Sequence, residues 1–317
     1  MSKKIGTDIQ IAKKLLVDNK LVAIPTETVY GLAGNALNPD AVAQIFAVKN
    51  RPFFDPLILH TDNFEKIRPF LKAIPEKAQK LADTFWPGPL TLVLNKTSAI
   101  PDICTSGLST VGVRIPNHKL TLELLAQLDF PLAAPSANPF KYISPTSAQH
   151  VFDQLGEQLP YILDGGNCNI GVESTIIGFS ETNEVLVYRL GGLEIEKIEA
   201  VVGKVKIITN NDSNPAAPGM LKLHYSPTKK LLLNSYENIC KITDPSVGFI
   251  TYKNKPDSKN TCVVLSESGN INEAAANLFA SMRALDASNV SYIVAEIFPD
   301  EGLGRAINDR LNRASAK

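Results

Sequence analysis

The sequence predicts an α/β protein built from two domains. Its 317 residues exceed the length of one average domain and are enough for two domains that each bury a core. Short apolar runs suited to strands alternate with segments whose apolar residues recur at helical spacing. A polar, turn-rich stretch at 209–219 separates a longer first block from a shorter second one. We therefore expect domains at 1–207 and 230–317, joined by a linker at 208–229.

The first block predicts a mixed sheet with flanking helices. The chain opens with an amphipathic helix over 9–16, because apolar residues recur at helical spacing after Thr7 or Asp8 as the cap. Strands are expected at 21–24, 56–60, 90–95, 111–115, 131–134, 161–163, 174–179 and 185–190. Helices are expected at 40–49, 64–71, 76–85, 120–128, 146–155 and 194–201. The hairpin-like spacing of the last two strands favours a mixed sheet over a purely parallel one.

The second block repeats this alternation on a smaller scale. Its strands are expected at 230–233, 247–251, 262–265 and 291–297. Its helices are expected at 271–285 and 304–314. Strands that alternate with helices indicate a second, smaller α/β domain.

The bulk composition excludes several classes of function. Lys and Arg together number 32 and balance 32 Asp and Glu, so no overall basic charge predicts nucleic-acid binding. The 4 cysteines form no C-x-x-C pair, which argues against zinc, an iron–sulfur cluster or a disulfide framework, and we expect all of them to be small buried residues. No apolar run approaches bilayer-spanning length and no signal-peptide pattern is present, so we expect a cytoplasmic protein without a membrane partner.

The first polar motif follows the strand at 21–24. The strand ends at Pro25, and the polar residues Thr26, Glu27 and Thr28 follow before Gly31. In an extended segment the two threonine hydroxyls face one side and the glutamate faces the other. A pocket wall and a strand end whose threonines satisfy turn amides are both compatible with this spacing.

A cationic pair follows the next helix. Lys49 and Arg51 can converge on one anion, although cations at a solvated helix end also complement the helix dipole. The loop 52–56 begins and ends with proline and contains two phenylalanines, so we expect it to form part of the pocket wall beside the pair.

Later strand ends carry the same residue types. Arg114 lies among apolar neighbours, where it either pairs inside the core or holds a ligand carboxylate. The end of the expected strand and the segment after it, 133–139, consist mostly of small residues, which allows the backbone to approach a ligand closely. Ser144 precedes a proline at an expected helix start, where a hydroxyl caps the helix or binds phosphate. Ser174 and Arg189 add a further hydroxyl and a further cation.

Motifs that the sequence lacks narrow the chemistry. It contains no P-loop, no G-x-G-x-x-G after a strand, no G-x-S-x-G elbow and no H-E-x-x-H. Its 4 histidines show no metal-ligand spacing, so we expect no metal held by protein side chains. His60 ends a strand beside the expected pocket, whereas the other histidines are expected to be ordinary core or surface residues.

Taken together, these motifs resemble the YrdC-type domain. The shared segments are Pro25-Thr26-Glu27-Thr28-Val29-Tyr30-Gly31-Leu32, Lys49-x-Arg51-Pro52, Pro56-Leu57, Arg114-Ile115-Pro116, Pro135-Ser136-Ala137-Asn138, Glu173-Ser174-Thr175 and Arg189-x-Gly191. Downstream, Pro218-Gly219-Met220 and His224-Tyr225-Ser226-Pro227 resemble the linker of the two-domain threonylcarbamoyl-AMP synthases. The resemblance covers essentially the whole chain. It implies a YrdC-like twisted mixed sheet with flanking helices, plus a smaller C-terminal Rossmann-like α/β domain.

The resemblance also implies an activity. It is that of an L-threonylcarbamoyladenylate synthase, a nucleotidyltransferase that forms threonylcarbamoyl-AMP and pyrophosphate from L-threonine, bicarbonate and ATP for tRNA N6-threonylcarbamoyladenosine biosynthesis. The implied partners are a downstream tRNA threonylcarbamoyl transferase and, from the basic concave surface of the family, RNA. Mg²⁺ is implied with ATP, coordinated mainly by phosphates and water because no carboxylate cluster is evident.

Roles for single residues follow from the same resemblance. It implies L-threonine binding by Thr28, His60, Arg114, Ala134 and Ser174, with Arg114 pairing the substrate carboxylate. It implies ATP binding by Arg51, Asp55, Thr110, Ser136, Asn138, Ser144, Arg189 and Tyr225. Lys49 and Arg51 are the implied catalytic cations. Two positions depart from the family: Asp55 stands where Asn is usual, and Ala134 lacks a hydroxyl, so any contact there must come from its backbone.

Two other functions compete with this one. Carbamoyl-adenylate chemistry on another acceptor occurs in hydrogenase-maturation carbamoyltransferases, but the acylphosphatase-like and zinc-finger segments of those proteins are missing here. A double-stranded RNA-binding module would bind with a steep salt dependence and would not turn over ATP. If the linker carries His224 and Tyr225 over the first domain, it becomes a lid that excludes water, and deletion of 209–227 should impair adenylate formation.

Overall fold

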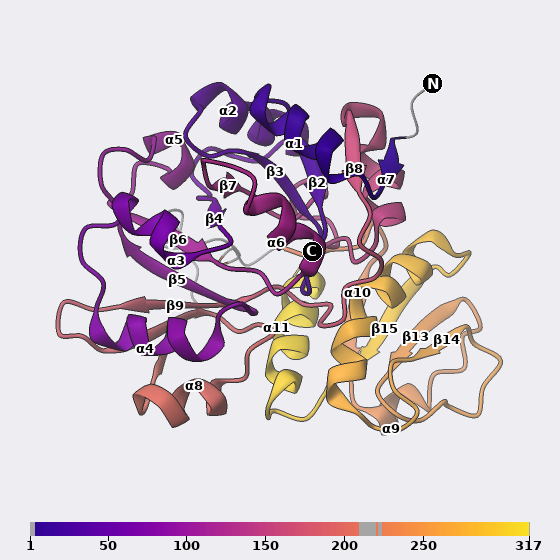
Figure 1. Ribbon diagram of the computed structural model, residues 1–317. Helices are drawn as coiled ribbons and strands as arrows, with labels where there is room; N and C mark the ends of the chain where they lie inside the picture. The colour runs from indigo at the N-terminus through magenta and orange to yellow at the C-terminus, as the bar shows by residue number, and fades with distance from the viewer. Residues whose placement is uncertain (1–3, 209–219, 221–223, 317) are drawn as a thin grey trace.

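The computed structural model describes residues 4–208, 220 and 224–316, which form two lobes packed side by side (Figure 1). We call residues 4–208 the N-terminal lobe, 224–227 the crossing segment and 228–316 the C-terminal lobe. Each lobe contains one β-sheet with helices packed on it. The first sheet is mixed and the second is parallel, which confirms the predicted fold class.

The N-terminal sheet positions most of the predicted site. Its strands are β1 (Ile5–Gly6), β2 (Val22–Ile24), β3 (Gly31–Asn35), β4 (Ile58–His60), β5 (Leu90–Asn95), β6 (Thr110–Arg114), β7 (Leu132–Ala133), β8 (Tyr161–Leu163), β9 (Thr175–Phe179), β10 (Val185–Arg189) and β11 (Lys206–Ile207). They lie in the order β1-β8-β2-β3-β7-β4-β6-β5-β9-β10-β11. β4 and β6 pair in parallel with His60 in register with Arg114, so strands distant in sequence bring two predicted site residues together.

Helices flank this sheet, and two of them, α1 and α2, begin at the caps that the sequence predicts. They are α1 (Ile9–Val17), α2 (Pro39–Lys49), α3 (Phe64–Ile67), α4 (Glu76–Phe85), α5 (Asp102–Thr105), α6 (Lys119–Leu125), α7 (Ala148–Leu155) and α8 (Ile195–Val202), with 3₁₀ turns at Arg68–Phe70 and Gly156–Gln158. The Asp8 carboxylate accepts hydrogen bonds from the first N–H groups of α1. Asn38 caps α2, and Pro39 occupies its first turn, where a missing N–H costs nothing.

Several elements differ from the sequence-based prediction. The short strands β1, β3 and β11 and the one-turn helix α5 are additional. β3 reads Gly-Leu-Ala-Gly-Asn, a composition that disfavours strands, and its neighbours β2 and β7 supply the pairing that its own residues do not encode. α7 begins at Ala148, because the Ser147 side chain accepts a hydrogen bond from the His150 N–H. Ser144 therefore does not lie at a helix N-terminus, and that prediction was wrong.

The C-terminal lobe is a smaller α/β unit. Its elements are β12 (Leu231–Asn234), α9 (Tyr236–Ile239), β13 (Val247–Thr251), β14 (Cys262–Val264), α10 (Ile271–Ala287), β15 (Tyr292–Glu296) and α11 (Leu303–Ser315). The strands pair in parallel in the order β12-β15-β13-β14. Figure 1 shows α10 and α11 between this sheet and the N-terminal lobe. These two helices are therefore the part of the C-terminal lobe that reaches the site.

A single hydrophobic cluster spans the two lobes. It joins Val29, Ile143 and Val172 of the N-terminal lobe to apolar side chains of α10 and α11, among them Phe279. Tyr225 of the crossing segment belongs to the same cluster. Separating the lobes would return this apolar surface to water, so the C-terminal lobe supports the geometry of the junction.

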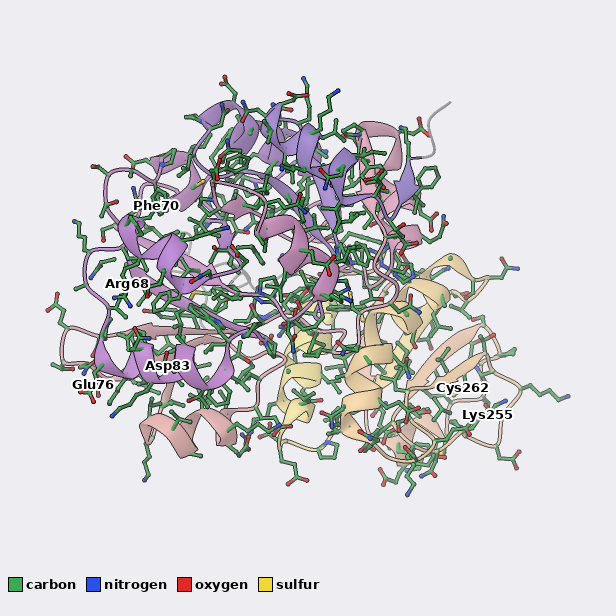
Figure 2. All side chains as sticks on the ribbon, viewed as in Figure 1. Arg68, Phe70, Glu76, Asp83, Lys255 and Cys262 are labelled. Carbon is green, nitrogen blue, oxygen red and sulfur yellow. The ribbon has the colours of Figure 1, made fainter. Side chains whose placement is uncertain are left out.

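Many charged side chains outside the pocket lie on the outer surface. Figure 2 shows Arg68, Glu76, Asp83 and Lys255 pointing away from the ribbon, where water solvates them. Within the described ranges, no helix combines the length and the apolar character needed to cross a membrane.

The cysteines only partly match the prediction. Cys104 and Cys168 are buried, as expected for small apolar side chains. Cys262 is half-buried and Cys240 is exposed, since it follows the short surface helix α9. The expectation that all four are buried was wrong for these two.

Candidate active site

A pocket lies at the junction of the lobes, between β4, β6, the segments that follow β2 and β7, and the crossing segment. Its cavity volume is about 50 Å³. The predicted site residues that line it are Thr28, Arg51, His60, Arg114, Ala134, Ser136, Ser174, Arg189 and Tyr225. Thr26, Glu173 and His224 line it as well.

Other predicted site residues do not line the pocket. Lys49, Asp55, Asn138 and Ser144 lie behind its wall, and each is bonded to a lining residue. Thr110 opens β6, whereas Arg114 ends that strand. At about 3.3 Å per residue along a strand, Thr110 lies ~13 Å from Arg114, and the structure does not bring it into the pocket.

Arg114 is the centre of one end of the pocket. Its Nη1 donates to Thr28 Oγ1 over 2.9 Å, and its Nη2 lies 2.7 Å from Glu27 Oε2. The hydroxyl oxygens of Thr28 and Thr26 are 2.8 Å apart, which confirms that they share a side. The expectation that Glu27 faces away was wrong, because residues 27–29 bend instead of continuing as a strand and bring its carboxylate to Arg114.

His60 lies beside this arginine as a neutral side chain. Burial, reinforced by the positive charge of Arg114, lowers the pKa of His60 to about 3. Its Nδ1 lies 3.2 Å from the carbonyl oxygen of Ile58. A neutral imidazole can donate one hydrogen bond and accept another, so His60 offers the pocket polarity without charge.

Lys49 and Arg51 do not converge on one anion. α2 ends at Asn50, whose φ of 49° is left-handed, and this turn sends the two side chains to different places. Lys49 donates to the carbonyl oxygens of Ser136 and Asn138, the latter over 2.6 Å. Burial and the nearby Arg51 lower the pKa of Lys49 well below its usual value. Lys49 thus shapes the pocket wall from behind.

Arg51 reaches the pocket and is paired there with Asp55. Its Nη2 lies 2.9 Å from Asp55 Oδ1, and the same nitrogen donates to the carbonyl oxygen of Pro56 over 2.9 Å. Asp55 is fully buried, and burial raises its pKa against the opposing influence of Arg51. The carboxylate that departs from the family pattern is therefore an internal partner of Arg51.

Arg189 stands out among the arginines that line the pocket. Its Nε donates to the carbonyl oxygen of Ser174 and its Nη2 donates to Ser174 Oγ, both over 3.0 Å. Ser174 Oγ lies in turn 2.8 Å from Thr91 Oγ1. Within the part of the chain that the structure describes, Arg114 and Arg51 each have a carboxylate within 4.0 Å, whereas Arg189 has none. Its charge is available to an anionic ligand.

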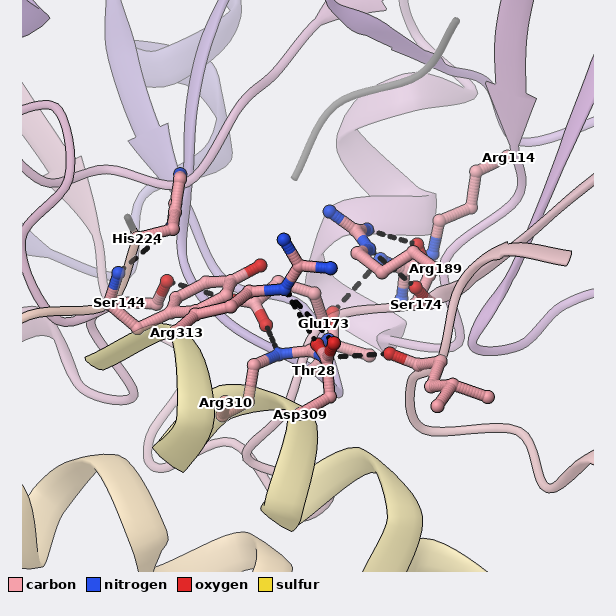
Figure 3. Close-up of polar contacts among 12 residues, drawn as sticks. Thr28, Arg114, Ser144, Glu173, Ser174, Arg189, His224, Asp309, Arg310 and Arg313 are labelled. Carbon is pink, nitrogen blue, oxygen red and sulfur yellow. Dashed lines mark hydrogen bonds and ion pairs between the residues drawn. The ribbon is translucent and has the colours of Figure 1, made fainter. Parts of the chain in front are cut away.

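Glu173 connects the pocket to the C-terminal lobe, as Figure 3 shows. Ser144 donates to Glu173 Oε1, and Arg310 Nε donates to Glu173 Oε2 over 2.8 Å. Arg310 also donates through Nη1 to the Leu190 carbonyl oxygen and to Asp309, both over 2.7 Å. The last helix of the chain therefore contributes to the pocket wall.

The sequence-based site prediction missed Arg310. A signal for it exists, because Arg310 occupies the apolar stripe of α11 formed by Ala306, Ile307, Leu311 and Ala314. An arginine at such a position is buried, and a buried cation needs a partner. The identity of that partner depends on how the two lobes pack, which helical spacing does not specify.

The crossing segment closes the pocket from the side of the C-terminal lobe. Tyr225 is buried with a left-handed φ of 60°, stacks on Phe279 at 5.6 Å between ring centroids, and lies beneath the guanidinium of Arg310 at 5.0 Å. Its hydroxyl has no hydrogen-bond partner among the described residues. Burial and several surrounding arginines lower the pKa of His224 well below its usual value, so this ring is neutral.

Most of the predicted lid lies outside the described residues. These are 209–219 and 221–223, and the effect of deleting 209–227 remains a prediction. Met220 is described and packs on side chains of β4, β5 and β9.

Among the residues that the structure describes, the buried carboxylates near the pocket are paired with arginines. The buried pairs are Glu27 with Arg114, Asp55 with Arg51 and Glu173 with Arg310. Among the described residues, no group of three or more His, Cys, Asp or Glu side chains is arranged to hold a metal.

Two family models match consecutive parts of the chain. The model described as telomere recombination matches residues 14–191. The model described as threonylcarbamoyl-AMP synthase, C-terminal domain, matches residues 193–316. The first range lies within the N-terminal lobe, and the second begins just before α8 of that lobe and extends through the C-terminal lobe.

Curated relatives and a solved structure agree with these models. The threonylcarbamoyl-AMP synthase of Pyrococcus abyssi is 41% identical over 97% of this chain and 94% of its own length. The threonylcarbamoyl-AMP synthase of Bacillus subtilis is 40% identical over 97% of this chain and 93% of its own length. The crystal structure of P. abyssi Sua5 complexed with L-threonine has a TM-score of 0.91 at 40% identity and covers 97% of this chain and 94% of that one. The chain therefore belongs to the threonylcarbamoyl-AMP synthase family, which confirms the function and the enzyme class that its motifs predict.

Proposed function

We propose that the pocket joins L-threonine, bicarbonate and ATP into threonylcarbamoyl-AMP and pyrophosphate. The observation that carries this proposal is the presence of two different cationic ends in one buried pocket. Arg114, with the Thr28 hydroxyl, forms one end, and Arg189, which has no carboxylate within 4.0 Å among the described residues, forms the other. A carboxylate and a phosphate are the groups that arginine recognises best, so the pocket suits a small amino acid beside a nucleotide.

L-threonine is proposed to bind at the Arg114 end. The guanidinium holds the substrate carboxylate, and Thr28 and neutral His60 hydrogen-bond its remaining polar groups. The Ala134 N–H already donates to the Ile58 carbonyl oxygen over 3.1 Å. The backbone contact expected from Ala134 must therefore come from its carbonyl oxygen.

ATP is proposed to bind at the Arg189 end. Arg189 and Arg51 face the phosphates, while Ser136 supplies a hydroxyl in the lining; Ser174, held by Arg189, stays a proposed L-threonine contact. The unpartnered Tyr225 hydroxyl supports a further contact with the nucleotide. Lys49 and Ser144 act from behind the wall by fixing the residues that line it.

The proposed chemistry requires placement more than a protein nucleophile. The ammonium group of threonine gives up a proton, and bicarbonate takes up a proton and loses water to give carbon dioxide. The free amine adds to the carbon dioxide and releases a second proton, which gives a carbamate. A carbamate oxygen then attacks the α-phosphorus of ATP in line with the bond to the leaving pyrophosphate. Fixing both substrates in a buried pocket lowers the entropic cost of this attack, and the arginines stabilise the developing negative charge.

Mg²⁺ is proposed to enter with ATP. Because each carboxylate near the pocket is paired with an arginine in the described part of the chain, the triphosphate and water would supply its ligands. We further propose that 1–207 is the catalytic domain, 208–229 the linker and 230–317 the C-terminal domain. The consumer of the product would be a tRNA threonylcarbamoyl transferase in the cytoplasm, and direct RNA binding remains a prediction of the family resemblance.

Pyrophosphate release tests the proposed activity. The purified chain is expected to release pyrophosphate from Mg²⁺-ATP only when both L-threonine and bicarbonate are present. L-serine in place of L-threonine tests the substrate assignment. Release that persists without an amino acid, or that is equally fast with L-serine, would contradict the proposal.

A further inference from the structure

Arg310 is the buried cation through which the C-terminal lobe reaches the pocket. Its side chain is fully buried and bonded to a carboxylate of the other lobe, Glu173. Asp309 holds the same guanidinium from the other side over 2.7 Å. Arg310 Nη2 has no partner among the described residues, so the ion pairs and the Leu190 carbonyl account for the orientation of the group.

Glu173 borders two cations, and only one of them is paired with it. Glu173 lies next to Ser174, to which Arg189 donates two hydrogen bonds, and both Glu173 and Arg189 line the pocket. Burial lowers the pKa of Arg189 and the nearby Glu173 carboxylate opposes this effect, yet the carboxylate oxygens are bonded to Ser144 and Arg310. The free charge of Arg189 therefore depends on where Glu173 is held.

We propose that Arg310 is a positioning residue that keeps the Glu173 carboxylate away from Arg189 and so preserves the Arg189 charge for the nucleotide phosphates. Without Arg310, Glu173 would be a buried carboxylate lacking its main counter-charge, and such a group pairs with the nearest available cation. That cation is Arg189. This inference rests on the proposed function, because it assumes that Arg189 binds phosphate.

Direct binding measurements test this role without relying on turnover. Arg310→Met removes the charge and roughly preserves the volume of the side chain. Arg305→Met is the matched control, because Arg305 lies on the same helix and pairs with Glu196, outside the pocket. Calorimetry would measure the Kd of the α,β-methylene analogue of ATP with Mg²⁺ and, separately, the Kd of L-threonine.

The nucleotide and threonine affinities should respond differently. Arg310→Met is expected to raise the Kd of the nucleotide analogue about tenfold and to change the Kd of L-threonine less than about twofold, a factor of ten being ~1.4 kcal/mol. Arg305→Met should leave both values at the level of the parent. A merely structural role for Arg310 would weaken both ligands together.

A second substitution distinguishes repositioned charge from lost packing. In Arg310→Met/Glu173→Gln the Glu173 carboxylate is no longer present to neutralise Arg189, so nucleotide affinity should return to within about threefold of the parent, because the two sites are coupled. A double variant that binds nucleotide as weakly as Arg310→Met would overturn the proposal, and so would an Arg310→Met variant that binds like Arg305→Met. If Arg310→Met shows no cooperative unfolding, Arg310→Gln, which also removes the charge, replaces it with the same expected direction and rescue.

The outcome for the proposed function is read separately. A parent chain that binds the nucleotide analogue but forms no threonylcarbamoyl-AMP would refute the proposed function. The role of Arg310 would then still be decided by the nucleotide Kd of each variant relative to the parent. A parent chain that binds no nucleotide would refute both.

Discussion

Replacing Arg114 with methionine should separate threonine binding from nucleotide binding. The change removes a guanidinium that contacts Thr28 Oγ1 at 2.9 Å and Glu27 Oε2 at 2.7 Å. It leaves the nucleotide end, around Arg189, unaltered. Two consequences follow, one for affinity and one for stability.

The magnitudes come from the burial of the ion pair. The Arg114 side chain is 5% exposed and that of Glu27 is 4% exposed, so solvent screens the pair little. Loss of the arginine that holds a buried ligand carboxylate costs about 2–5 kcal/mol of binding free energy, which at the lower limit is ~30-fold in Kd. Leaving Glu27 buried without its partner costs a further ~3–5 kcal/mol of folding stability.

Calorimetry with L-threonine and urea unfolding would measure the two effects. Arg114→Met/Glu27→Gln is the control, because neutralising Glu27 should restore most of the folding stability without restoring threonine affinity. The Kd of the nucleotide analogue should stay within about threefold of the parent in both variants, because the hydrogen bonds that hold Arg189 on Ser174 do not involve Arg114. Threonine affinity that survives in Arg114→Met, or that returns in the double variant, would refute the assignment of Arg114 to the substrate carboxylate.

Three further outcomes are expected. His60 stays neutral down to about pH 3 in the folded chain but protonates near pH 6.5 in the unfolded chain, so the free energy of unfolding falls as the pH drops below 6.5. His60→Gln lacks this titration. Between about pH 7 and about pH 5, its free energy of unfolding in urea titrations should therefore fall by ~2 kcal/mol less than that of the parent. Asp55→Asn should tighten binding of the nucleotide analogue about threefold by freeing the charge of Arg51, while thermal melts show lower stability; weaker nucleotide binding would contradict this. Ser147→Ala should lower stability by about 1 kcal/mol in the same melts through loss of the α7 cap, with unchanged pyrophosphate release.

Most of the fold could be predicted because apolar periodicity and caps reflect local chemistry. The strands at Leu90–Asn95 and Tyr161–Leu163 and the helix Glu76–Phe85 have the predicted bounds. β3 could not be predicted, because its glycines and asparagine gain strand conformation only from the neighbours that pair with it. Ser144 was misplaced at a helix start, since a serine three residues later, Ser147, supplies the cap.

The site was predicted as a set of residues but not as a set of contacts. Motif positions identified Arg114, Arg51 and Arg189 from single stretches of sequence. The partners of the first two, Glu27 and Asp55, are close in sequence to pocket residues, yet only the bend after Pro25 and the turn after α2 show that they pair. The contribution of α11 was missed because it depends on packing between elements far apart in the chain.

The fate of the bicarbonate carbon tests the central claim most directly. The chain would be incubated with ¹³C-bicarbonate, L-threonine and Mg²⁺-ATP, and the adenylate product would be examined by mass spectrometry before it hydrolyses. We expect one adenylate that contains threonine and one labelled carbon, formed together with pyrophosphate. An adenylate of threonine without the label, or pyrophosphate release without any threonine-containing adenylate, would contradict the account.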